Sequence, residues 1–107
     1  FIPQLAPDTV ADGLRTSLGQ LTWPFIRDEV DEILLADDLA TISAMKFFWE
    51  RTKVMIEPSC AVPIAAIINH FSKSIHNDSS RKFPQNIGII ISGGNVDLQA
   101  LPWLKER

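Results

Sequence analysis

Cysteine is almost absent from this chain of 107 residues, and Cys60 is the only one. A single cysteine excludes a disulfide bond within the chain. This cysteine and the two histidines also lack the spacing of a zinc site. Chains of this kind are typical of a reducing compartment, so we expect a cytoplasmic protein.

Long apolar runs and clusters of basic residues are also missing. No apolar run reaches the ~18–20 residues that a membrane-spanning helix requires. Lysine and arginine are scattered along the sequence and the formal net charge is −3, so no basic patch indicates a nucleic-acid partner. We therefore expect neither nucleic acid nor a membrane among the partners of this protein.

The first residues show neither an initiating methionine nor the pattern of a secretory signal. They include Pro3 and Pro7, and residues 1–13 are expected to form a loop. A chain that opens in this way resembles the interior of a longer protein, and we expect it to be a piece of one. Its apolar content of 46% is enough for the core of one small domain.

Apolar residues recur at helical spacing in the middle of the chain. The clearest pattern predicts a helix over residues 38–54, preceded by acidic residues that suit a helix start. A second pattern predicts a helix over residues 61–75, with Pro63 in its first turn. One or two helical turns are expected over residues 14–18, and a short helix is expected to begin after Thr22.

Two short apolar segments, residues 30–35 and 87–91, predict β-strands. The second is apolar at successive positions, which is typical of a strand covered on both faces in a parallel sheet. Strands that alternate with helices indicate an α/β fold with crossover connections. Two strands cannot cover several apolar helices, so we expect the architecture of this chain to be incomplete by itself.

A polar turn directly follows the second predicted strand and consists of Ser92, Gly93, Gly94 and Asn95. Open α/β sheets bind ligands at the carboxyl ends of their strands. Ser92 offers a hydroxyl at such an end, and the two glycines allow the backbone to approach a flat ligand closely. By itself, the same pattern is also compatible with an ordinary turn.

Five segments of the sequence resemble one enzyme family in their order and spacing. These segments are Thr9-Val10-Ala11-Asp12-Gly13-Leu14, Thr22-Trp23-Pro24, Trp49-Glu50-Arg51-Thr52-Lys53, Ile56-Glu57-Pro58-Ser59 and Ser92-Gly93-Gly94-Asn95-Val96-Asp97. The family comprises the serine racemases and serine/threonine dehydratases, which are pyridoxal-phosphate enzymes of the second fold type. The resemblance covers essentially the whole chain, but only about the last third of such an enzyme.

The resemblance implies that residues 1–107 are the C-terminal segment of the large, cofactor-binding domain, with an α/β fold. The implied cofactor is pyridoxal phosphate, and a divalent cation and ATP are further expected ligands of the complete enzyme. The lysine that holds the cofactor, the glycine cradle for its phosphate and the acidic ligands of the cation would all precede Phe1. We therefore expect this chain alone to be inactive.

The resemblance also implies that four residues lie at the cofactor. Ser92 faces the pyridine nitrogen, and Gly93 leaves room beside the ring. Glu57 lies near the same ring, and the backbone of Gly13 lines the face on which the reaction occurs. A serine hydroxyl is not ionised at neutral pH, so it can donate a hydrogen bond to the nitrogen without supplying a negative charge.

Sites for a substrate and a nucleotide are implied in the same way. Thr16 occupies a position at which the family offers a hydroxyl to the substrate. Lys53 and Asn95 match positions that contact an activating nucleotide at the subunit interface. The residues alone allow simpler interpretations, with Glu57 as a helix cap, Lys53 as a solvated charge and Cys60 as a packed side chain.

The function implied by the resemblance is that of a pyridoxal-phosphate enzyme acting on a small hydroxy amino acid. The complete enzyme would racemise serine, or dehydrate serine or threonine to a 2-oxo acid and ammonia, and it is expected to be a homodimer. The alternative is a non-catalytic remnant that pairs with an intact member of the family and regulates it.

Overall fold

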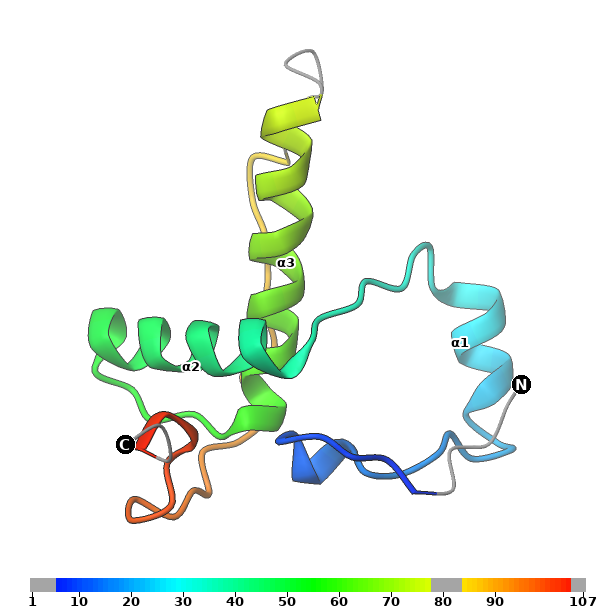
Figure 1. Cartoon of the computed structure of the whole chain (residues 1–107). Coiled ribbons are helices and arrows are strands. Elements are labelled where there is room, and N and C mark those ends of the chain that lie inside the picture. Colours follow the sequence, from blue (N-terminus) through cyan, green and yellow to red (C-terminus); the bar gives the residue numbers. More distant parts are fainter. Residues whose placement is uncertain (1–5, 78–83, 105–107) are drawn as a thin grey trace.

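The computed structural model describes residues 6–77 and 84–104, and within these ranges the regular structure is entirely helical (Figure 1). In chain order the elements are the short 3-10 helix η1 (Asp12–Leu14), the α-helices α1 (Trp23–Glu29), α2 (Asp38–Thr52) and α3 (Pro58–Asn77), and the 3-10 helix η2 (Pro102–Leu104). None of these described helices is long and apolar enough to cross a membrane.

Helix α2 confirms the predicted helix over residues 38–54, apart from its last two residues. It begins at an acidic cap, where the carboxylate of Asp37 accepts a hydrogen bond of 2.7 Å from the backbone N–H of Ala40. It ends at Lys53, which has a left-handed φ of 62° and donates its backbone N–H to the carbonyl of Trp49 at 3.0 Å.

Helix α3 begins three residues before the predicted start at residue 61. Pro58 takes the first helical position, where a missing N–H costs no hydrogen bond. The carbonyl of Glu57 accepts the first helical bonds, from the N–H groups of Cys60 and Ala61. Pro63 therefore lies inside the helix rather than at its start, and it removes the N–H that would donate to the carbonyl of Ser59.

The core lies where α2 packs against α3 (Figure 1). Its buried apolar residues are Ala44, Met45, Ile56, Cys60, Ala61, Ile64, Ala65 and Leu101. The indole N–H of Trp49 donates to the carbonyl of Ile56 at 2.9 Å, and the Trp49 ring meets that of Trp103 edge-to-face at 5.3 Å. These two contacts attach the chain after α2, and also η2, to one end of α2.

The two predicted strands are extended but unpaired, so the structure does not confirm the expected sheet in the described residues. Residues 30–35 approach the middle of α3, where residues 33–35 line a small pocket with Ala66. Residues 84–92 run along α3 instead, with Ile89 packed against the core and the N–H of Ser92 bonded to Cys60 (Figure 1). A strand needs a hydrogen-bonding neighbour, and no backbone hydrogen bond joins these two segments in the described residues.

The residues before α2 differ in part from the predicted pattern. Residues 1–13 were expected to form a loop, of which residues 1–5 lie outside the described residues. The helical turn expected over residues 14–18 occurs earlier, as η1 at Asp12–Leu14. Helix α1 confirms the predicted short helix, with Pro24 in its first turn. The hydroxyl of Thr22 donates to the carbonyl of Gly19 at 3.0 Å and does not cap the helix.

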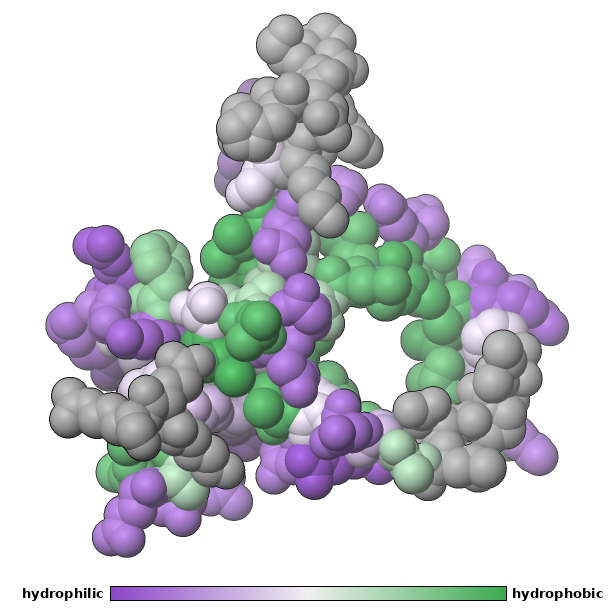
Figure 2. Space-filling model, viewed as in Figure 1, coloured by the Kyte–Doolittle hydropathy of each residue, from purple (hydrophilic) through white to green (hydrophobic). Residues whose placement is uncertain are grey.

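Residues 18–36, which we call the α1 arm, project from the core through α1 and return to it at Ala36 (Figure 1). Helix α1 contacts none of the other described helices and has no buried residue. Large apolar side chains of the arm are exposed, with Leu21 at 88%, Phe25 at 69% and Leu35 at 85%. Figure 2 shows this apolar surface in green around an opening between the arm and α3. An apolar surface of this kind marks a region that packs against further protein.

We expect the isolated chain to self-associate, because the exposed side chains of the α1 arm favour burial against one another. Sedimentation velocity over a range of protein concentrations measures this association. The double variant Phe25→Ser/Leu35→Ser is expected to associate more weakly, since these side chains lie outside the α2–α3 core. A monomer with a sharp unfolding transition that does not depend on concentration would contradict this expectation.

Candidate functional site

The polar turn at residues 92–95 lies against the segment that leads into α3. The backbone N–H of Glu57 donates to the carbonyl of Gly93 at 3.2 Å. The backbone N–H of Asn95 donates to the Glu57 carboxylate at 3.0 Å, and that of Ser92 donates to the sulfur of Cys60 at 3.3 Å. Residues far apart in the sequence are thereby held together at the start of α3.

The two glycines of this turn are needed for close approach. A Cβ added to Gly93 would lie 2.9 Å from Oε1 of Glu57, and a Cβ on Gly94 would lie 2.5 Å from the carbonyl oxygen of Met55. Neither glycine has a positive φ, so the backbone conformation itself does not require glycine. The absence of a side chain is what allows the turn to contact the start of α3.

Gly13 joins the same group of residues from the N-terminal side. Its backbone N–H donates to Oγ of Ser59 at 2.9 Å and also to the carboxylate of Asp12 at 2.9 Å. A Cβ on Gly13 would lie 2.9 Å from Oγ of Ser59 and 3.9 Å from Oε1 of Glu57. The structure thus brings Gly13 and Gly93 to the same carboxylate, and we call Gly13, Glu57, Ser59, Ser92 and Gly93 the Glu57 cluster.

The contacts of Glu57 do not support the simpler interpretation of this residue as a helix cap. Within the described residues, its carboxylate accepts the N–H of Asn95, which belongs to the turn and not to α3. Only its backbone carbonyl takes part in the helix start. The side chain therefore connects the turn to the helix.

Ser92 is exposed, and its backbone is fixed by the sulfur of Cys60. Its hydroxyl makes no hydrogen bond within the described parts of the chain, so it is available to a ligand. The thiol of Cys60 is fully buried, which confirms its interpretation as a packed side chain. Its contact with Ser92 was not predicted, because no sequence pattern indicates which residue lies across from a buried thiol.

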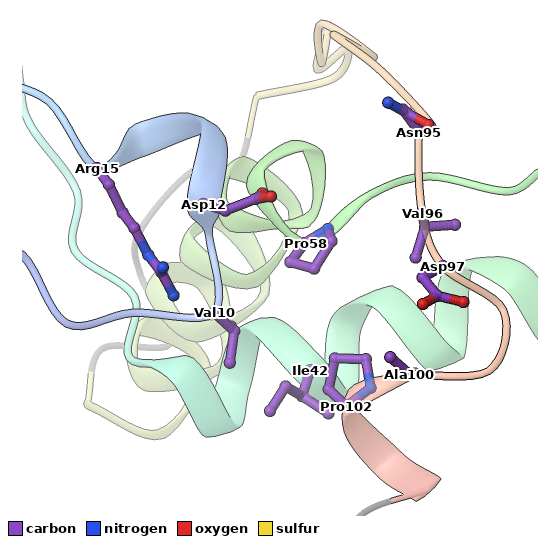
Figure 3. Close-up of a pocket in the computed structure, with 10 residues that line it drawn as sticks. All are labelled: Val10, Asp12, Arg15, Ile42, Pro58, Asn95, Val96, Asp97, Ala100 and Pro102. Carbon is purple, nitrogen blue, oxygen red and sulfur yellow. The ribbon is translucent and has the colours of Figure 1, made fainter.

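A cavity of about 400 Å³ opens beside the Glu57 cluster (Figure 3). Its lining comes from the segment around η1, from α2, from the start of α3 and from residues 95–102, and consists of Val10, Asp12, Arg15, Ile42, Pro58, Asn95, Val96, Asp97, Ala100 and Pro102. The guanidinium of Arg15 is held by the carbonyl of Thr9 at 3.0 Å. The cavity is adjacent to the cluster because Asp12 precedes Gly13 and Pro58 follows Glu57.

Within the described residues, the side chains of Thr16 and Lys53 make no hydrogen bond to the Glu57 cluster. The hydroxyl of Thr16 donates to the carbonyl of its neighbour Ser17 at 3.4 Å, and the side chain is exposed. The ammonium of Lys53 donates to the carbonyl of Glu50 at the end of α2. Asn95 lines the cavity whereas Lys53 does not. The substrate and nucleotide roles of these residues stay predictions, and no group of three possible metal ligands occurs among the described residues.

Ser59 is the member of the cluster to which the sequence assigned no role. It belongs to the segment Ile56-Glu57-Pro58-Ser59, but its spacing alone does not indicate a partner 46 residues away. A serine directly after Pro58 also fits the first turn of an ordinary helix. Its contact with Gly13 becomes visible only in the folded chain.

Comparison with known proteins shows the family to which this chain belongs. The family model of pyridoxal-phosphate dependent enzymes matches residues 2–93. The serine racemase of Arabidopsis thaliana is 49% identical over 94 residues, which cover 88% of this chain and 28% of that protein. A β-hydroxyaspartate dehydratase of Paracoccus denitrificans is 42% identical over 98 residues, which cover 92% of this chain and 29% of that protein.

A solved structure extends the likeness to the fold. Maize serine racemase superimposes with a TM-score of 0.77 at 45% sequence identity, over 97% of this chain and 31% of that one. The chain therefore spans less than a third of the length of the relatives that it matches. With the family model matching most of its residues, the chain belongs to the pyridoxal-phosphate dependent enzymes, and its relatives within them include serine racemases and a dehydratase.

Proposed function

We propose that this chain forms one wall of the cofactor site in a pyridoxal-phosphate enzyme that racemises or dehydrates a small β-hydroxy amino acid. The observation that carries the proposal is the Glu57 cluster, in which Gly13 and Gly93 both lie beside the Glu57 carboxylate. The four residues for which the resemblance implies cofactor contacts all belong to this cluster.

The residues of the cluster fit a flat, nitrogen-containing ring. The exposed hydroxyl of Ser92 is a hydrogen-bond donor on a backbone that Cys60 and Glu57 hold in place. Gly93 presents no side chain beside it, so a ring can approach the turn closely. When bound, pyridoxal phosphate supplies an electron-withdrawing pyridine ring that eases removal of the α-proton of an amino acid.

The chemistry of Ser92 favours some outcomes of this reaction over others. An un-ionised hydroxyl stabilises the ring nitrogen without the full negative charge that an aspartate supplies. Electron withdrawal is then weaker than in a site with an ion pair. A weaker effect suits racemisation and β-elimination better than transfer of the amino group, which needs longer-lived negative charge.

The names of the two sequence relatives support a shared substrate class. Serine and β-hydroxyaspartate both carry a hydroxyl on the β-carbon of an α-amino acid. Removal of the α-proton is common to both reactions. Return of a proton to the opposite face gives the other enantiomer, whereas departure of the β-hydroxyl leads to dehydration and release of ammonia.

Four further features are proposed for the complete enzyme. These are a bound divalent cation, ATP bound at Lys53 and Asn95, a contact of Thr16 with the substrate, and a homodimeric assembly. The non-catalytic remnant is the alternative function. It predicts that the complete polypeptide is inactive and that it binds an intact relative, so an assay of serine racemisation and ammonia release by the complete polypeptide separates the two functions.

We expect Ser92→Ala to weaken cofactor binding in the complete enzyme by about 1–3 kcal/mol, because the ring nitrogen loses its hydrogen-bond donor. Ser92→Thr keeps the hydroxyl and serves as the matched control. Ser92→Asp is expected to change the absorption spectrum of the bound cofactor, since a carboxylate favours protonation of the ring nitrogen. Fluorescence titration and absorbance measure these effects. Unchanged affinity and spectrum in both Ala and Asp variants would show that Ser92 does not contact the ring.

We expect the chain of 107 residues by itself to release no ammonia from serine and to bind no pyridoxal phosphate at a defined site. The reason is that the chain supplies only one wall of the proposed site and spans less than a third of its relatives. Absorbance titration with the cofactor, followed by borohydride reduction and mass spectrometry, measures defined binding. A stoichiometric adduct at one lysine would contradict this expectation.

A further inference from the structure

Asp38 ties the segment before Gly13 to the start of α2. Its Oδ1 accepts a hydrogen bond of 2.6 Å from the hydroxyl of Thr9, and its Oδ2 accepts one of 3.0 Å from the backbone N–H of Val10. The Thr9 hydroxyl oxygen in turn accepts the backbone N–H of Ala11 at 3.2 Å. One carboxylate therefore orients two consecutive residues, and indirectly a third.

The same segment has a second attachment at its other end. The N–H of Gly13 donates to Oγ of Ser59, a residue that is only 8% exposed in the first turn of α3. Ala11, between the two attachments, is buried. Residues 9–13 are thus fixed to the first turns of α2 and α3, which pack against each other.

Asp38 is not needed to cap α2, although it is the first residue of that helix. The neighbouring Asp37 is the cap, with its carboxylate on the N–H of Ala40. The two adjacent aspartates therefore have different structural roles. Asp37 stabilises the helix end, whereas Asp38 binds a segment that is 28 residues away in the sequence.

The contacts of Asp38 use both oxygens of its carboxylate. Both of its partners, the Thr9 hydroxyl and the Val10 N–H, are donors, and both oxygens of the carboxylate accept. An asparagine has only one acceptor oxygen, so Asp38→Asn replaces two hydrogen bonds to a charged group by bonds to a neutral amide, one of them with donor and acceptor exchanged, without changing the size of the side chain. Thr9→Val removes the hydroxyl with a similarly small change in shape.

We propose that Asp38 is a positioning residue of the cofactor site, which acts through Thr9 and Val10 to hold Gly13 beside Glu57. This inference rests on the proposed function, in which the backbone of Gly13 lines the reacting face. Asp38 does not contact Gly13 or Glu57 within the described residues, so its effect on the site is indirect. Releasing it removes the hydrogen bonds that hold the N-terminal end of residues 9–13, whereas the burial of Ala11 and the bond of Gly13 to Ser59 remain.

The test compares matched variants of the complete enzyme. Asp38→Asn and Thr9→Val break the attachment, whereas Thr9→Ser keeps the hydroxyl. Asp37→Asn is the control for an equal loss of charge at the same helix end. Two readouts are used: hydrogen–deuterium exchange of the peptide that contains residues 9–14 in the cofactor-free enzyme, and the circular dichroism of bound pyridoxal phosphate together with kcat and KM for serine.

In Asp38→Asn and Thr9→Val, we expect exchange of this peptide to rise about tenfold, because a hydrogen bond to a charged group is lost. We also expect altered circular dichroism of the cofactor and a fall in kcat larger than any rise in KM. Thr9→Ser should behave like the native enzyme. Asp37→Asn keeps a side-chain acceptor for the cap of α2, and it should leave exchange at residues 9–14 and the cofactor signal unchanged.

Native-like exchange in Asp38→Asn, or equal effects of Asp37→Asn and Asp38→Asn on the cofactor signal, would overturn the positioning role. Faster exchange with an unchanged cofactor signal would also overturn it, since the segment would then be held for stability alone. If the native enzyme takes up no pyridoxal phosphate, the proposed function fails. The exchange measurement still decides in that case whether Asp38 fixes residues 9–13.

Discussion

The close approach of the turn at residues 92–95 to the start of α3 is the contact on which the site depends. A side chain at Gly94 would collide with the carbonyl of Met55, and a side chain at Gly93 would collide with the Glu57 carboxylate. Because both positions are glycine, the backbone of Glu57 can bond to Gly93 while its carboxylate bonds to the N–H of Asn95. This contact places the turn beside the start of α3, to which the segment that carries Gly13 is bonded through Ser59.

The helices were predictable because their signals are local. The apolar period and the acidic cap at Asp37 are sufficient to locate α2. The start of α3 was missed because Pro58 and Pro63 both suit a first turn, and only the fold selects between them. The prediction of a sheet was not confirmed for a different reason. An apolar segment such as residues 87–91 becomes a strand only beside a partner, and no strand pairs with it in the described residues.

The site was predictable to the extent that its residues belong to recognisable segments. Ser92, Gly93, Glu57 and Gly13 stand in such segments, and the structure brings them into one cluster. The residues that hold the cluster together were not predictable, because their partners are distant in sequence. Ser59 and Asp38 were missed for this reason, and an aspartate at the start of a helix is normally explained by capping alone.

The most direct test of this account is a crystal structure of the complete enzyme with pyridoxal phosphate bound. The account predicts that Oγ of Ser92 lies within about 2.7–3.2 Å of the pyridine nitrogen, with Gly13, Glu57 and Gly93 in the contacts described above. A ring nitrogen that faces another side chain, with the hydroxyl of Ser92 pointing away from the cofactor, would contradict it.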